Sequence, residues 1–160
     1  MRLGFMPYDK VFEVLKALHA HDVEYVLVGA AAINLLGLVR PTHDLDLSSG
    51  PRRRTSQLRA ALRSVWDDPE IEQIAAAELA GEIAVVRYGP PETELIVDIL
   101  ARLGSMFTID DLEWKWQTHG GVPVRLATPR TIYRMKCDTL RPQDKMDAAR
   151  LREKFGKEVE

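Results

Sequence analysis

The stretch that decides the fold runs from Val39 to Ser49 and reads VRPTHDLDLSS. Two aspartates alternate in it with two leucines, which is the period of a β-strand with one buried face. Asp44 and Asp46 therefore project to one side, while Leu45 and Leu47 can enter a core on the other. Carboxylates held this close repel each other unless a cation neutralises them, and hard oxygen ligands suit Mg²⁺. A solvated edge strand with an acidic face is the alternative that the pair alone leaves open.

The 160-residue chain has the composition of a globular protein, with 46% hydrophobic and 29% charged residues. Its length fits one domain over residues 1–160, with a core at about 23–126 and a C-terminal helical segment at about 128–157. The single cysteine, Cys137, excludes an internal disulfide and a cysteine-built zinc site. Lys10 and Glu13 interrupt any signal-like apolar run, and no segment reaches membrane-spanning length. We therefore expect a cytoplasmic protein without a membrane partner.

The charge is unevenly distributed along the chain. The net charge is −2, yet residues 128–157 hold nine Lys or Arg against four Asp or Glu. An acidic body with a basic C-terminal segment suits a metal on one side and a phosphate-bearing partner on the other. A solvated helix face explains the same charges, and on charge alone that interpretation is favoured.

Hydrophobic periodicity and turn residues predict an α/β (α+β) fold with a small mixed β-sheet flanked by helices. Helices are predicted over residues 8–21, 30–36, 51–65, 109–116, 128–140 and 144–155, and further strands over 23–28, 82–88, 93–100 and 122–126. The turn at 89–92 predicts an antiparallel hairpin, and residues 71–79 fit a helix or an irregular insertion. Trp114 and Trp116 are interpreted as packing or interface residues.

Three further residues bear on the acidic strand. Asp98 lies in a second strand among large apolar neighbours, so it is exposed at a rim, caps a backbone group, or shares a cation with other acids. Gly29 ends one strand and leads directly into a helix, where backbone N–H groups can approach a bound anion. His43 points to the face opposite Asp44 and is expected to pack rather than act as a base.

The sequence Val28-Gly29-Ala30, thirteen residues, and then Asp44-Leu45-Asp46-Leu47 resembles the signature of the DNA polymerase β-like nucleotidyltransferase superfamily. That signature is a hydrophobic residue, Gly and Gly or Ser, a helix, two alternating acids, and a third acid on a later strand. Two stretches, 40–47 and 136–151, further resemble the minimal nucleotidyltransferases and the AbiEii-type toxin group. The resemblance covers roughly residues 23–151.

This resemblance implies a magnesium-dependent enzyme that moves an NMP, AMP-like, from an NTP to a hydroxyl of a protein, RNA or small molecule. Asp44 and Asp46 would hold two Mg²⁺ ions, and Asp98 would complete the site of the catalytic ion and help take the acceptor's proton. The backbone at Gly29 and Ala30 would lie against the triphosphate. Ala30 departs from the family's Gly or Ser, so one hydroxyl that commonly contacts a phosphate is missing.

Three basic residues are candidate nucleotide contacts, each with a structural alternative. Arg40 contacts a phosphate or forms a salt bridge between its loop and the acidic strand. Lys136 and Arg141 face the nucleotide or tie the last helices to the body through Asp144 and Asp147, and for these two acids the structural role is favoured.

Two functions of different classes remain open. One is the nucleotidyltransferase, acting alone or as the toxin of a toxin–antitoxin system. The other is a catalytically silent nucleotide-binding or regulatory module that acts with a partner protein, such as a helical antitoxin. The intact acids favour the enzyme, whereas Ala30 and the lack of a separate acceptor domain favour the module. The chain has no P-loop, HExxH or GxGxxG motif, which leaves kinase, zincin and dinucleotide-binding functions without support.

Overall fold

The computed structural model describes residues 6–49, 55–74, 85–101 and 108–160, and its centre is a mixed sheet of order β3-β4-β2-β1-β6-β5. β1 pairs in parallel with β6, and β2 pairs in parallel with β4, whereas the β1–β2, β3–β4 and β5–β6 pairs are antiparallel. The strands are β1 (Tyr25–Val28), β2 (Asp44–Ser49), β3 (Val85–Tyr88), β4 (Ile96–Leu100), β5 (Trp114–His119) and β6 (Val122–Ala127). The predicted mixed sheet and the predicted hairpin are confirmed.

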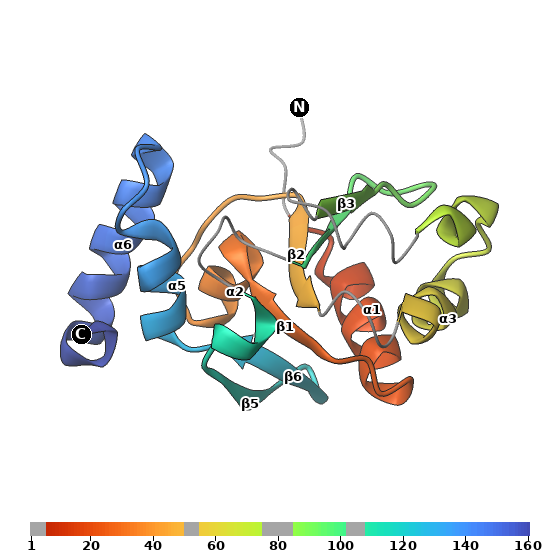
Figure 1. Cartoon of the computed structure of the whole chain (residues 1–160), viewed down its shortest axis with the longest axis horizontal. Coiled ribbons are helices and arrows are strands. Elements are labelled where there is room, and N and C mark those ends of the chain that lie inside the picture. The colour runs from red at the N-terminus through yellow and green to blue at the C-terminus, as the bar shows by residue number, and fades with distance from the viewer. Residues whose placement is uncertain (1–5, 50–54, 75–84, 102–107) are drawn as a thin grey trace.

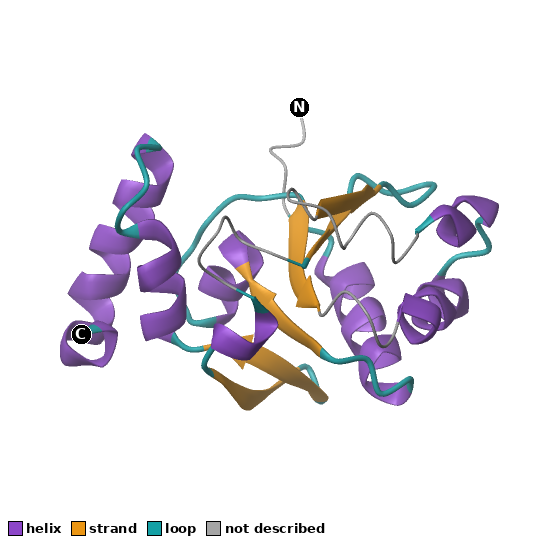
Figure 2. Ribbon diagram, viewed as in Figure 1, coloured by secondary structure: helices purple, strands orange, loops and turns teal. Residues whose placement is uncertain are grey.

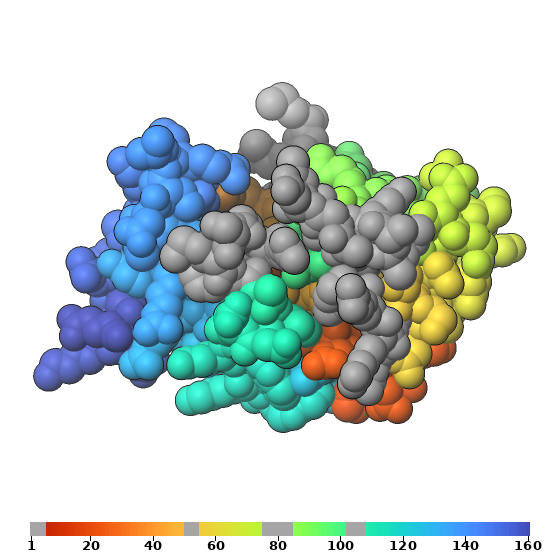
Figure 3. Space-filling model, in the orientation of Figure 1, coloured from red at the N-terminus to blue at the C-terminus, as the bar shows by residue number. Residues whose placement is uncertain are grey.

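Helices lie on both sides of the sheet, with α1 and α3 on one side and α5 and α6 on the other (Figures 1 and 2). The helices are α1 (Tyr8–Ala20), α2 (Gly29–Leu35), α3 (Thr55–Val65), α5 (Pro129–Lys136) and α6 (Pro142–Phe155). Short 3₁₀ turns cover Pro69–Gln73, Ile109–Asp111 and Gly156–Val159. In the space-filling view the C-terminal helices form one end of the molecule and α3 lies toward the other (Figure 3).

The core forms where one face of the sheet meets α1 and α3. Residues of α1 at helical spacing are fully buried, including Val11, Val14, Leu15 and Leu18. Burial of each such side chain contributes about 1.5–3 kcal/mol relative to exposure. The apolar stripe read from the sequence is therefore the packing face of the helix.

The acidic strand β2 has the alternation that its sequence predicts. Leu45 and Leu47 are buried in the core, whereas Asp44 and Asp46 are only partly buried and point away from it. The strand sits between β1 and β4, so its backbone is paired on both sides. An exposed edge strand, the alternative reading of the Asp-Leu-Asp-Leu pattern, is excluded by this position.

The helix predicted over residues 109–116 is wrong. A 3₁₀ turn at Ile109–Asp111 is followed by the edge strand β5, which pairs with β6 along its length. Gly120 and Gly121 connect them, both with positive φ (57° and 78°), as a two-residue hairpin loop requires. Tertiary pairing thus decided the conformation of a segment whose local signal was ambiguous.

Other boundaries differ less. The strand predicted over 93–100 begins at Ile96, and the helix predicted over 128–140 ends at Lys136. The predicted residues 51–54, 75–79 and 82–84 lie outside the described residues. Within the part of the chain that is described, no helix is long and apolar enough to cross a membrane.

Candidate functional site

The acids Asp46 and Asp98 stand side by side in neighbouring strands. β2 and β4 run parallel, with Asp46 in register with Asp98 and Asp44 in register with Ile96. Residues in register share a face of the sheet, so both carboxylates project from the same side, and Asp44 does so two residues away. Asp98 is 6% exposed. The sequence-predicted acids therefore come together on one face, from two strands about fifty positions apart in the chain.

Gly29 lies against this face at the junction of β1 and α2. Val28 pairs with Asp46, and the next residue, Gly29, has a φ of +73°. A Cβ placed on Gly29 would collide with the carboxylate of Asp46. Glycine is thus required twice, for the left-handed backbone and for the space beside the acid. Ala30 follows inside α2, where its side chain is buried.

The surroundings of Asp46 disfavour its charged form. Burial, together with the charges of Asp98 and Asp44, raises the pKa of Asp46 to about 7, against the opposing effect of Lys136. A carboxyl that is half protonated at neutral pH marks a site with uncompensated negative charge. Such a site favours a cation.

Arg87 supplies a cation that the sequence did not predict. It stands opposite Asp98 in the β3–β4 pair, and its Nε and Nη2 donate to the two oxygens of Asp98 at 3.0 and 3.2 Å. The hydrogen bonds and charge of Asp98 raise the pKa of Arg87. The Asp98 side chain is 9% exposed, whereas that of Arg87 is 66% exposed. The guanidinium therefore covers the third acid from the solvent side.

Lys136 lies at the centre of a buried ionic cluster between α5 and α6. Its Nζ donates to Asp144 at 3.0 Å and to Asp147 at 2.9 Å. Although burial acts to raise the pKa of Asp144, hydrogen bonds from Lys136 and Thr139 lower it below its usual value. Asp144 and Asp147 thus have a structural role, because they tie α6 to α5 through Lys136. The charge of Lys136 also acts to lower the pKa of Asp46.

Arg40 joins the same cluster. Its Nε donates to Asp147 at 3.1 Å, and its backbone N–H and C=O bond the side-chain amide of Asn34, each at 2.7 Å. A salt bridge from Arg40 to the acidic strand was one sequence-based alternative, and the partner is instead an acid of α6. The loop before β2 is fixed in place by α2 and α6 because of these bonds.

The remaining candidates are more exposed. Arg141 lies at the N-terminus of α6, where its charge helps lower the pKa of Asp144. The Nδ1 of His43 lies 3.9 Å from a carboxylate oxygen of Glu94. His43 therefore adjoins the end of the acidic strand without contributing to its carboxylate face.

Asp44, Asp46 and Asp98 offer carboxylate oxygens, which suit a hard divalent cation. These side chains are not, however, arranged as a formed set of metal ligands. The uncompensated charge on Asp46 and the carboxylate chemistry of its neighbours fit Mg²⁺. In the described ranges, no group of three or more His, Cys, Asp or Glu side chains is arranged to hold a metal ion. Because Arg87 donates to both oxygens of Asp98, a metal at the third acid would compete with that guanidinium.

Comparison with known proteins identifies the fold. The solution structure of the antibiotic-resistance factor ANT(2″)-Ia is 15% identical, with a TM-score of 0.56 over 94% of this chain and 85% of that one. The crystal structure of ANT(2″)-Ia in complex with adenylyl-2″-tobramycin is 18% identical, with a TM-score of 0.54 over 92% and 88%. An antigenic nucleotidyltransferase-like protein from Paracoccidioides brasiliensis is 15% identical, with a TM-score of 0.53 over 91% and 77%.

The fold is nucleotidyltransferase-like. No protein-family model and no curated protein matches the sequence. Nothing in these comparisons distinguishes the AbiEii-type group within the wider resemblance. The two ANT(2″)-Ia structures and the Paracoccidioides brasiliensis protein share their architecture with this chain. Because the sequence identities are so low, this similarity shows the fold alone.

Proposed function

We propose that the chain is a magnesium-dependent nucleotidyltransferase that moves an NMP from an NTP to an acceptor hydroxyl. The observation that carries this proposal is the register of Asp46 with Asp98, which gathers acids on one face next to the backbone of Gly29, where only the absence of a side chain lets the Asp46 carboxylate fit. That combination suits phosphates and their counter-ions together. The fold shared with nucleotidyltransferases supports it.

In this proposal Asp44 and Asp46 hold the metal ions and Asp98 completes the site of one of them. Bound Mg²⁺ would neutralise the phosphates and lower the pKa of the attacking hydroxyl. Asp98 accepts the acceptor's proton, a role that suits a carboxylate freed from Arg87. The backbone of Gly29 and Ala30 orients the triphosphate, and Lys136, Arg40 and Arg141 carry positive charge toward it.

The acceptor hydroxyl belongs to a small molecule, an RNA or a protein side chain. ANT(2″)-Ia was crystallised with an adenylylated aminoglycoside, which makes a small polyol the first acceptor class to test. A silent nucleotide-binding module is the second candidate function. The bidentate Arg87–Asp98 pair favours it, because an acid neutralised in this way is a weaker metal ligand.

Transfer can be tested directly by mass spectrometry. The protein is incubated with Mg²⁺, each of the four NTPs and either an aminoglycoside panel or a cell lysate, and products are searched for an added NMP. We expect one NTP to yield a metal-dependent adduct that Asp46→Asn abolishes. Glu70→Gln, an exposed acid outside the acidic face, is the matched control and retains activity. Undiminished transfer by Asp46→Asn would refute the assignment, and binding without transfer by the wild type would favour the module.

A further inference from the structure

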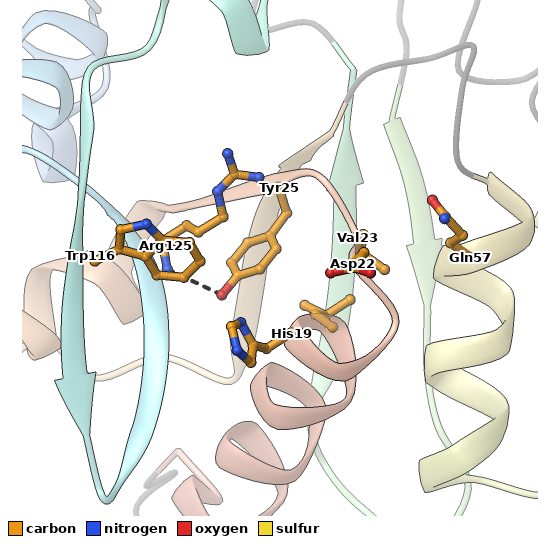
Figure 4. Close-up of a pocket in the computed structure, with 8 residues that line it drawn as sticks. His19, Asp22, Val23, Tyr25, Gln57, Trp116 and Arg125 are labelled. Atoms are coloured by element: carbon orange, nitrogen blue, oxygen red, sulfur yellow. Dashed lines mark hydrogen bonds between the residues drawn. The ribbon is translucent and has the colours of Figure 1, made fainter.

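A pocket lies away from the acidic face. Its volume is about 460 Å³, within the usual range of small-molecule sites. It lies between the end of α1, the start of α3, β1 and the β5–β6 hairpin (Figure 4). The polar and aromatic residues that line it are His19, Asp22, Tyr25, Gln57, Trp116 and Arg125.

The position of Tyr25 separates this pocket from the acids. Tyr25 pairs with Ser49 at one end of the β1–β2 ladder, and Val28 pairs with Asp46 at the other. Tyr25 and Val28 are three residues apart, which corresponds to roughly 10 Å along the strand and places their side chains on opposite faces of the sheet. The pocket therefore opens at the other end of β1 and is not part of the proposed transfer site.

One wall of the pocket is an aromatic platform. Trp116 is 54% exposed, which is unusual for so large an apolar side chain. Its ring is held edge-to-face by His19, with centroids 5.7 Å apart, and by Trp114, at 5.4 Å. The guanidinium of Arg125 lies 4.1 Å from the Trp114 ring and 5.7 Å from that of Trp116. A large ring is thus fixed in orientation yet open to a planar ligand.

Polar groups of complementary kinds accompany this platform. Among the described residues, neither Oε1 of Gln57 nor Nε of Arg125 has a hydrogen-bond partner, although both atoms are buried. The hydroxyl of Tyr25 accepts from the backbone N–H of Arg125 at 3.2 Å, and burial raises the pKa of Tyr25. The phenol therefore keeps its proton at neutral pH and can donate. The Tyr25 hydroxyl and the Arg125 guanidinium therefore lie beside Trp116, whereas the Gln57 amide lies on α3 across the pocket from it (Figure 4).

We propose that this pocket binds a nucleobase, stacked on Trp116 and hydrogen-bonded along its edge by the hydroxyl of Tyr25 and the guanidinium of Arg125. Bases stack on aromatic side chains through faces that every base has, and a hydroxyl and a guanidinium can hydrogen-bond to base edges. The lining holds one Arg and one Asp, so no excess positive charge is present to recognise a free triphosphate. The base of a nucleoside or of an RNA strand is the recognised part. This proposal does not depend on the transfer reaction.

The tryptophan indoles report on binding directly. The chain has three tryptophans, and Trp66 is buried against Tyr88, outside the pocket, as an internal reference. In ¹⁵N spectra recorded with EDTA, we expect added adenosine, guanosine, cytidine or uridine to shift the Trp116 indole saturably while Trp66 stays unmoved. Absence of a saturable Trp116 shift at millimolar concentrations of all four nucleosides would overturn the proposal.

Variants separate the pocket from the acidic site. Equilibrium dialysis with the labelled nucleoside should show binding weakened by about tenfold or more in Trp116→Ala, the loss expected when one stacking ring is removed. Tyr25→Phe, which removes only the hydroxyl, should weaken it as well. Asp46→Asn and Met146→Ala, the latter an exposed apolar residue on α6, should bind as the wild type does. Loss of nucleoside binding in Asp46→Asn would move the base to the acidic site and refute the pocket.

Two further ligands define the chemical class. Indole offers a stacking face without the edge pattern of a base, so equal affinity for indole would contradict a nucleobase site. A short oligoribonucleotide that binds more tightly than the nucleoside identifies RNA as the source of the base. Tighter binding of the nucleoside instead identifies a free small molecule.

Discussion

The guanidinium of Arg87 holds both carboxylate oxygens of Asp98, which itself stands in register with Asp46. The protein thereby places its own cation on the acid that we propose as the third metal ligand. Asp98 is almost inaccessible, whereas the arginine is long and largely exposed, so the arginine is the partner that can leave. A metal at Asp98 therefore competes with Arg87 for the carboxylate oxygens.

Replacing Arg87 with glutamine should make Mg²⁺ bind more tightly. An exposed ion pair contributes little net free energy, so removing the competing guanidinium should lower the Mg²⁺ midpoint by about twofold to fivefold. Thermal unfolding measured against Mg²⁺ concentration gives that midpoint. Arg63→Gln, which removes an exposed pair with Glu72 far from the acids, is the control and should leave it unchanged. An unchanged midpoint in Arg87→Gln would mean that Asp98 is not a ligand.

The raised pKa of Asp46 predicts how stability depends on pH. Its pKa is about 7 in the folded protein and near 3.8 when unfolded, so between these values the folded state binds more protons. Without metal, stability should therefore fall as the pH rises from about 4 to 7, by a few kcal/mol at most, since one unit is about 1.4 kcal/mol.

Denaturant titration across this pH range, in EDTA, compares the wild type with Asp46→Asn. The variant should lack this part of the pH dependence and be the more stable protein above pH 7. With Mg²⁺ present, stabilisation of the wild type should be larger at pH 8 than at pH 6, because the metal binds the carboxylate form. Equal slopes for both proteins would contradict the assignment of the pKa to Asp46.

Gly29→Ala should damage the acidic site through two separable effects. The positive φ costs about 1–2 kcal/mol for a residue with a Cβ, and the added carbon displaces the carboxylate of Asp46. Gly121→Ala is the matched control, since its φ is +78° and its Cβ would meet nothing within 4 Å. Both variants should lose stability, but only Gly29→Ala should also lose stabilisation by Mg²⁺ and nucleotide. A full response to Mg²⁺ in Gly29→Ala would show that the glycine serves the turn alone.

Ala30→Ser tests the departure from the family pattern. The added hydroxyl should keep or improve the affinity for a non-hydrolysable NTP, by less than about 1.5–3 kcal/mol after desolvation. Calorimetric titration with Mg²⁺ present measures this. A marked loss of affinity would show that the added hydroxyl forms no favourable contact with a phosphate.

Lys136→Met should destabilise the fold strongly. It leaves Asp144 and Asp147 buried without their shared cation, and breaking a buried pair in this way costs about 3–5 kcal/mol. Lys145→Met, an exposed lysine on the same helix α6, should cost little. Chemical denaturation compares the two, and similar small losses would show that the cluster is not what holds α5 and α6 together.

The acidic face could be predicted from the sequence because it depends on local rules. The alternation of Asp44 and Asp46 with leucines fixes which way each side chain points, and the glycine at position 29 ends a strand that enters a helix directly. The role of Asp98 needed the resemblance as well, since its apolar neighbours left three alternatives open. Its register with Asp46 settles which face it occupies.

Arg87 was missed because the hairpin register was not predictable from the turn. A loop of four residues at 89–92 would place Arg87 opposite Glu94. β4 instead begins at Ile96, and the longer connection brings Arg87 opposite Asp98. The pocket beside Trp116 was missed for a similar reason, because the segment that carries this residue was assigned to a helix and not to the strand β5.

The bond between Arg40 and Asp147 joins residues 107 positions apart. During synthesis the loop that leads into β2 leaves the ribosome long before α6 does, and in that interval Arg40 has no acid to bind. Lys136 of α5 likewise has neither of its acidic partners, Asp144 and Asp147, until α6 has been synthesised. Contacts of such sequence separation form late, after the local helices and hairpins. A nascent chain therefore contains Asp44, Asp46 and Asp98 well before it contains the acids of α6 that bind Arg40 and Lys136. The complete arrangement forms only in a chain that has been translated at least through α6.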